Sequence, residues 1–233
     1  EDSFVVLNET IYSNDEVWKN QAHSLQYEHG LSDNLTLSSN FHYTRYEQTS
    51  ELVSSLIQNR NGTIMIDSIY NSTDSQLQDW GYELSLKIGK PDNYLLVGFD
   101  YNDYKNNNLF TVDDETILNL NPKSNLLSQF AHYNTTHGKF NIQVANRLSN
   151  YNINQKNELI VSPQLSAQYR ITDNHAFKLS LGRSHQFMRE IEYENRFSQT
   201  FVINALANGN QIPVLRTDNL MAGYTFNTSG WSL

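Results

Sequence analysis

The sequence predicts an all-β protein. The expected fold is an antiparallel transmembrane β-barrel, present as an incomplete arc of about nine to ten strands of a larger barrel. Three observations support this prediction: hairpins of alternating apolar and polar residues, connections of two unequal lengths, and aromatic residues near strand ends. We expect residues 1–233 to form one segment of a single barrel domain.

The clearest hairpin covers residues 157–187. Apolar residues occupy every second position over 159–171, a polar turn follows at 172–174, and the alternation resumes over 177–181. Successive side chains of a strand point to opposite faces, so each arm has one apolar and one polar face. Both arms exceed a typical soluble strand, and a tilted transmembrane strand needs about 9–11 residues. Because the alternation continues through Pro163, we expect a bulge or a weakly paired position there.

Four further hairpins turn near residues 33, 92, 136 and 229. Their turns span about 3–5 residues, whereas the connections between hairpins span roughly 10–35. Short turns on one side and long loops on the other are typical of outer-membrane barrels. We expect the long polar connections to be external loops that capture a ligand. These connections are residues 47–78, with a helical turn at 50–58 and a short strand at 63–70, residues 103–123, and residues 188–218; residues 1–19 are read as a further loop.

Aromatic residues gather near the predicted strand ends, where amphipathic rings would meet the two bilayer interfaces. The alternative is that aromatic residues are simply common in strands. The loop-side set is Tyr43, Trp80, Tyr82, Tyr101 and Phe187, and the turn-side set is Tyr94, Phe140, Tyr169 and Trp231.

Composition excludes several classes of protein. Hydrophobic residues make up 38% of the chain and the mean hydropathy is −0.59, so a helical membrane protein is excluded. A net charge of −9 argues against nucleic-acid binding. There is no cysteine, and the seven histidines lack metal-ligand spacing. An acidic loop is a better reading of residues 113–115 than a cation site, and we predict no cofactor.

The last third of the chain resembles the barrel of TonB-dependent outer-membrane transporters, in particular members from Bacteroidota. The residues that carry this resemblance are Ser162, Pro163, Leu165 and Tyr169, then Gly182 and Arg183, then residues 214–218, Gly223 and Tyr224. A barrel of this family has about 22 strands and holds a plug. The resemblance therefore implies that the plug domain and the remaining strands are absent from this chain.

The resemblance implies a function and a location. Such a protein lies in the outer membrane of a Gram-negative bacterium, in contact with its lipid, and takes up a scarce nutrient such as siderophore–iron, cobalamin or a glycan. Energy would come from the TonB system through the missing plug, and a surface lipoprotein is a conceivable partner. The barrel would not be an enzyme.

The alternation of side chains between the two faces of each strand selects candidate ligand or lumen residues. Six polar side chains fall opposite the apolar face, and two more lie at the base of the last long connection. They are Glu83, Lys87, Gln164, Gln168, Arg170 and Lys178, then His185 and Arg189. Two other classes remain open. One is a soluble, secreted all-β ligand-binding module, and the other is an outer-membrane barrel enzyme, although no catalytic set is evident.

Overall fold

The structure is a computed structural model that describes residues 8–60, 63–154, 156–194, 200–209, 211–228 and 231–232. The described residues form strands and turns only. The strands are β1 (Asn8–Ser32), β2 (Leu35–Arg60), β3 (Thr63–Lys90), β4 (Asn93–Val112), β5 (Glu115–Leu120), β6 (Lys123–His137), β7 (Phe140–Ile153), β8 (Lys156–Thr172), β9 (His175–Gln186), β10 (Met188–Glu194), β11 (Thr200–Leu206), β12 (Leu215–Thr228) and β13 (Trp231–Ser232).

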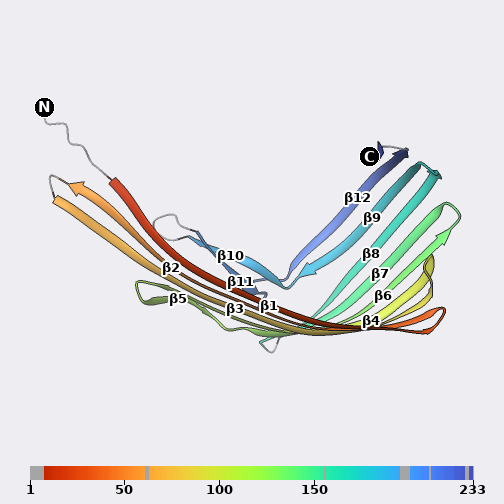
Figure 1. The fold of residues 1–233 in the computed structure, drawn as a ribbon, viewed down its shortest axis with the longest axis horizontal. Helices are drawn as coiled ribbons and strands as arrows, with labels where there is room; N and C mark the ends of the chain where they lie inside the picture. Colours follow the sequence, from red (N-terminus) through yellow and green to blue (C-terminus); the bar gives the residue numbers. More distant parts are fainter. Residues whose placement is uncertain are drawn as a thin grey trace.

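The strands form one large, curved antiparallel sheet with the order β1-β2-β3-β4-β6-β7-β8-β9-β12-β13, and β5 extends it by pairing with the far part of β4. Strands β10 and β11 form a separate hairpin. In Figure 1 the sheet is an open trough, and the β10–β11 hairpin lies on its concave side. Nine long strands and the start of a tenth along this path confirm the predicted arc of an antiparallel barrel.

The two faces of the sheet differ as the alternation predicts. Leu181 of β9 stands opposite Leu165 of β8 and Leu220 of β12, and all three side chains are 41% exposed or more. The other parity carries the polar residues, and on β4 it includes Asn106 and Asn108, which bond to β11 on the concave side. We therefore call the polar, concave face the inner face and the apolar face the outward face.

The prediction of a long loop at residues 47–78 is wrong. Residues 47–78 are not a connection, because β2 and β3 continue through them as a paired ladder from Leu35 opposite Ile88 to Arg60 opposite Thr63. The helical turn predicted at 50–58 is likewise strand, while the short strand predicted at 63–70 belongs to β3. Backbone pairing with one or both neighbours holds these strands together after the apolar alternation has ended.

The other predicted loops are also largely strand. In 103–123, β4 continues to Val112, turns at Asp113–Asp114 and returns as β5. In 188–218, the chain forms the β10–β11 hairpin before β12 begins at Leu215. Of residues 1–19, the structure describes those from Asn8 onward, and these belong to β1. Polar strands longer than the membrane requires therefore replace most of the expected loops.

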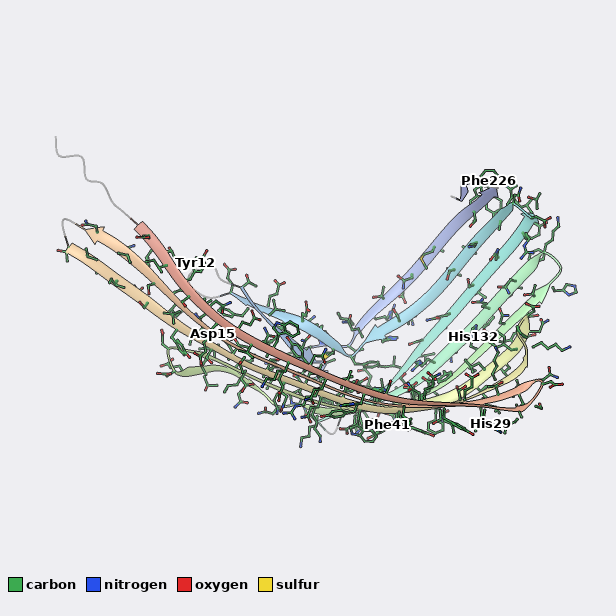
Figure 2. All side chains as sticks on the ribbon, viewed as in Figure 1. Tyr12, Asp15, His29, Phe41, His132 and Phe226 are labelled. Atoms are coloured by element: carbon green, nitrogen blue, oxygen red, sulfur yellow. The ribbon has the colours of Figure 1, made fainter. Side chains whose placement is uncertain are left out.

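Short turns lie at one end of the trough, as predicted: Asp33–Asn34, Pro91–Asp92, Gly138–Lys139 and Asp173–Asn174 each join paired strands. The strands differ in how far they extend away from this end. Figure 2 marks both ends of β1, with His29 near the short turns and Tyr12 far from them. Strands β1 to β3 have 25 to 28 residues, whereas β6 to β9 have 12 to 17.

Most of the predicted aromatic positions face outward. Trp80 pairs with Tyr101 at 5.3 Å between ring centroids, and Phe140 pairs with Tyr169 at 4.6 Å near the short turns. Two members of the predicted sets do not face outward: Tyr94 lies under the Lys87 ammonium on the inner face, and Phe187 packs on Tyr151. The side chain of Trp231 lies outside the described residues. No helix in the described part of the chain is long and apolar enough to cross a membrane.

Candidate functional site

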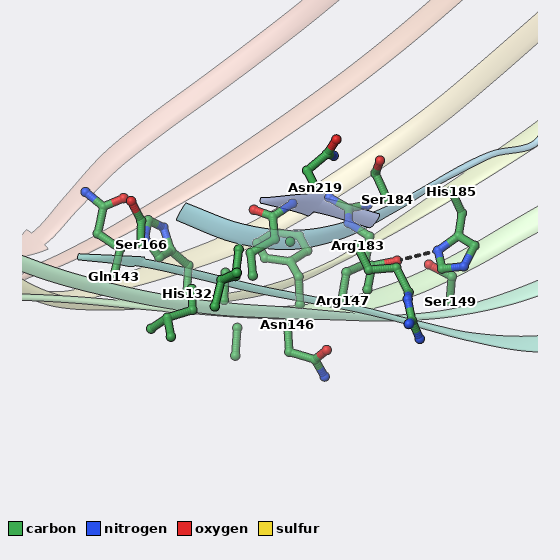
Figure 3. Close-up of a pocket in the computed structure, with 18 of the residues that line it drawn as sticks. His132, Gln143, Asn146, Arg147, Ser149, Ser166, Arg183, Ser184, His185 and Asn219 are labelled. Atoms are coloured by element: carbon green, nitrogen blue, oxygen red, sulfur yellow. Dashed lines mark hydrogen bonds between the residues drawn. The ribbon is translucent and has the colours of Figure 1, made fainter. Parts of the chain in front are cut away.

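The candidate site is a hollow of about 880 Å³ in the sheet, bordered by residues of both faces. Its lining comes from β3, β4, β6 to β9 and β12, and most of the polar groups are on the inner face. In Figure 3 Ser184 and Asn219 project to one side of the sheet and Asn146 to the other. The residues that matter for the argument below are Glu83, Phe130, Arg147, Gln164, Ser162 and His185.

One wall of the hollow is a stack of side chains across three strands. Gly98 of β4 lies beneath the ring of Phe130 of β6, and a Cβ at Gly98 would come within 2.6 Å of that ring. The guanidinium of Arg147 lies 5.2 Å from the centroid of the same ring and forms an ion pair with Asp100. The Asp100 side chain is only 9% exposed, whereas that of Arg147 is 45% exposed. The stack therefore presents a cation to the hollow with its counter-ion buried beneath it.

The β10–β11 hairpin is held on the inner face by amide groups. The side-chain amides of Asn106 and Asn108 both donate to the carbonyl oxygen of Asn204, at 3.0 and 2.6 Å. Asn108 also accepts from the Ser75 hydroxyl and donates to Asn106. The bonds among Ser75, Asn106 and Asn108 are buried and those to Asn204 are partly buried, and a satisfied polar network of this kind rigidifies the structure.

An apolar cluster fixes the end of the same hairpin. Its members come from the inner face of β6 to β8 and from residues 205–212, and each is at most 6% exposed. Tyr151 lies at its centre and donates a 2.8 Å hydrogen bond to the carbonyl oxygen of Ala207. Tyr151 stands beyond Leu148, the last apolar outward residue of β7, and burial raises the pKa of its phenol, so this donor keeps its proton. The cluster is Leu126, Tyr151, Ile153, Ile160, Ala205, Leu206, Ala207 and Ile212.

A seam opens between β8 and β9 on the side of the hollow away from the short turns. The ladder between these strands ends at Gln164 opposite Gly182, although β8 begins at Lys156 and β9 continues to Gln186. Pro163 is the next residue of β8; it stays in register with Asn146 of β7, so it forms no bulge but marks the end of pairing with β9. A hydrogen bond of 2.9 Å between Ser162 Oγ and His185 Nδ1 bridges the seam. Burial, and then Arg183 and Arg216, lower the pKa of His185.

The structure brings three of the eight predicted residues together, since Glu83, Gln164 and His185 all border the hollow. Four others lie nearer the short turns: Lys87 over the Tyr94 ring, Gln168 opposite Lys178, and Arg170, whose amide donates to the carbonyl of Lys139. Arg189 lies on the hairpin opposite Ala205. A role in ligand binding stays a prediction for all eight.

Sequence reasoning missed Asp100, Arg147 and the packing of residues 204–207 and 212 on the inner face. Arg147 falls on the polar parity of β7, so alternation could have found it, but its partner lies 47 positions away and leaves no local signal. Among the described residues, no group of three or more His, Asp or Glu side chains is arranged to hold a metal ion.

The fold and the apolar outward belt define this chain as part of an outer-membrane β-barrel. Residues 4–233 match the family described as TonB dependent receptor-like, beta-barrel, and the chain belongs to that family. This family lies in the outer membrane of Gram-negative bacteria and is not a family of enzymes, which confirms the predicted location and the prediction that the barrel is not an enzyme. Membership argues against the soluble-module and barrel-enzyme alternatives. A search of curated protein sequences found no match.

A solved structure supports the fold. The chain is similar to FpvAI in its complex with pyocin S2, with a TM-score of 0.51 and 9% identity, and the match covers 97% of this chain and 42% of that one. A second match is P. aeruginosa FpvA bound to heterologous pyoverdines, with a TM-score of 0.48, 9% identity and coverage of 96% and 42%. The chain thus spans less than half the length of these proteins. A Bacteroidota origin stays a prediction.

Proposed function

We propose that this arc is part of the barrel of an active transporter that takes up a scarce nutrient through a plugged lumen. The observation that carries the proposal is the hollow in the sheet, whose polar groups come mostly from the inner face and include the Arg147 stack. Such a site is concave, combines apolar walls with a few convergent polar groups, and is therefore typical of small-molecule binding.

The chemistry of the hollow favours a polar ligand rich in oxygen atoms. Arg147 offers donors that are half exposed, and Gln164, Ser166 and Gln143 add amides and a hydroxyl. A siderophore–iron complex, cobalamin and a glycan all present oxygen acceptors to such donors. The proposed substrate is one of these three classes.

The remaining parts of the full-length protein are proposed on the basis of the family. An open arc cannot separate two compartments, so the complete protein would close the barrel with further strands and fill it with a plug. TonB would act through that plug, and a surface lipoprotein could assist ligand capture. Glu83, Lys87, Gln164, Gln168, Arg170 and Lys178 would then line the path or touch the plug, and His185 and Arg189 would lie at its outer end.

The function is tested by uptake in cells that carry the full-length protein. Radiolabelled ferric siderophores, cobalamin and oligosaccharides would be supplied separately to strains with and without a working TonB system. We expect one class to accumulate only when both the transporter and TonB are present. Accumulation that survives loss of TonB would identify a passive channel instead, and uptake of none of the three classes would reject the proposed substrates.

The location of the ligand is tested by charge removal on the two faces of the sheet. Arg147→Gln should weaken ligand binding by about tenfold, because a charge-assisted hydrogen bond is lost. Lys105 lies on the outward face of β4, so Lys105→Gln removes a cation from the opposite face and is the matched control. Isothermal titration with the purified transporter would show equal effects of the two variants if the hollow does not bind the ligand.

A further inference from the structure

A second cluster of charges lies on the outward face, at the edge of the apolar belt. Arg183 of β9 stands opposite Asp218 of β12, one step beyond the outward pair Leu181 and Leu220. Below that pair the belt continues to Phe177 opposite Tyr224, whose rings lie 5.2 Å apart. The charged pair thus replaces the next apolar pair in the same column of side chains.

The cluster has two cations and one anion. Arg183 Nε donates to Asp218 Oδ1 at 2.6 Å, and Arg216 Nη2 and Nε donate to Asp218 Oδ2 at 2.7 and 3.1 Å. The side chains of Arg183, Asp218 and Arg216 are 36%, 50% and 56% exposed. One carboxylate holds both guanidinium groups in place, neutralises one of them and leaves a net positive charge with free N–H donors.

The height of the cluster places it at the outer head-group layer. Arg183 follows the last turn residue, Asn174, by nine positions, as Tyr101 follows Asp92 and Tyr43 follows Asn34. A tilted strand crosses the membrane in about 9–11 residues, so these positions mark the boundary of the belt on the side away from the short turns. Strands β2 to β4 carry aromatic rings at this level, whereas β9 carries Arg183 and β12 carries Asp218, with Arg216 one step farther from the short turns.

The sheet is also interrupted beside the cluster, because the pairing of β8 with β9 ends there. The hollow is bordered by outward-parity residues as well as inner ones, among them Asn146, Leu181 and Arg183, and all lie next to the seam where β8 and β9 cease to pair. A head group could therefore seat against Arg183 with its acyl chains along Leu181 and Leu220.

We propose that Arg183 and Arg216 form a binding site for the phosphate-bearing head group of an outer-leaflet glycolipid. Guanidinium groups match phosphate oxygens in bidentate geometry and are weakly hydrated, so they suit this anion at an interface. Asp218 positions the two arginines and does not touch the lipid. The inference depends only on the outer-membrane location and not on which nutrient the transporter carries.

The test uses the full-length protein in nonionic detergent without nutrient. Native mass spectrometry would compare lipid A carrying both phosphates with its dephosphorylated form. We expect the wild type to prefer the phosphorylated lipid by about tenfold or more. The double variant Arg183→Gln/Arg216→Gln should lose this preference, and Arg183→Lys/Arg216→Lys should retain part of it.

The matched control is Arg45→Gln. Arg45 is another outward arginine beyond the belt, but its charge is cancelled by Glu47. This variant should keep the preference for the phosphorylated lipid. Equal binding of the two lipids, or equal losses in the Arg45 variant and the double variant, would overturn the proposal. Competition by inorganic phosphate at the same concentration as the lipid would identify a free-phosphate site and would also overturn it. Unchanged heat-modified gel mobility would show that each variant is folded.

Discussion

Gly98 is the residue on which the closest packing of the inner wall depends. A Cβ at this position would lie 2.6 Å from the Phe130 ring and 2.5 Å from the carbonyl oxygen of Leu84. One of these is backbone, so the strand itself would have to shift. The Arg147 guanidinium, which pairs with Asp100, lies over the same ring, so the whole stack requires a residue without a side chain at position 98.

We predict that Gly98→Ala lowers the free energy of unfolding by about 1–3 kcal/mol, the usual cost of overpacking. Gly223→Ala is the control, because nothing lies within 4 Å of a Cβ there. Urea unfolding of the full-length protein in lipid vesicles would measure both changes. Equal effects of the two substitutions would contradict the predicted packing.

The ion pair beneath the hollow should respond unequally to loss of its two partners. Arg147→Gln leaves the nearly buried Asp100 carboxylate without its cation, whereas Asp100→Asn leaves a half-exposed guanidinium that water can solvate. We expect a loss of about 2 kcal/mol for the first variant and about 1 kcal/mol or less for the second. The same unfolding measurement compares them, and a larger loss for Asp100→Asn would refute this account.

Among the secondary-structure elements, the β10–β11 hairpin is the one that the sequence did not predict. Ile203, Ala205 and Leu206 are buried, but so short an apolar segment within a polar stretch does not indicate what it packs against. Its partners are Asn106 and Tyr151, distant in sequence and on different strands. Tertiary contacts of this kind cannot be read from local periodicity.

The long strands were missed for a different reason. Periodicity reveals a strand only where one face is apolar, and beyond Tyr43 the outward side chains of β2 are Arg45, Glu47 and Thr49. Both faces are polar there, so the pattern fades while the backbone ladder continues. Alternation therefore located the apolar part of the hairpins and underestimated the length of β1 to β4.

The hairpin should loosen when its phenol anchor is removed. Tyr151→Phe deletes the hydrogen bond to Ala207 and leaves a buried carbonyl with one partner fewer, at a cost of about 1 kcal/mol. Hydrogen exchange of residues 203–207 in the detergent-solubilised protein should quicken by about fivefold. Tyr133→Phe, on the outward face, is the control. Equal exchange in the two variants would show that Tyr151 does not hold the hairpin.

The whole molecule has a predicted orientation, with the short turns in the periplasm and the far ends of β1 to β3 outside the cell. This chain has no cysteine, so each single substitution introduces the one thiol of the segment, and the full-length protein without the substitution is the control for any other thiol. A membrane-impermeant maleimide on intact cells should label Ile66→Cys, whose parent side chain is 65% exposed, but not Asp173→Cys in a short turn. Both should react after the outer membrane is permeabilised. The reverse pattern on intact cells would invert the orientation.

The unequal lengths of the strands give the barrel a slanted mouth. Beyond Trp80, β3 continues for seventeen residues, which raises this side by about 40 Å above the belt, whereas β9 ends three residues beyond Arg183. A large body that settles on the cell, such as an antibody or a phage, would touch the tall side before it reached the hollow. A small molecule that approaches over β9 does not have to pass the long strands β1 to β3, so the tall wall is a barrier on one side of the arc only.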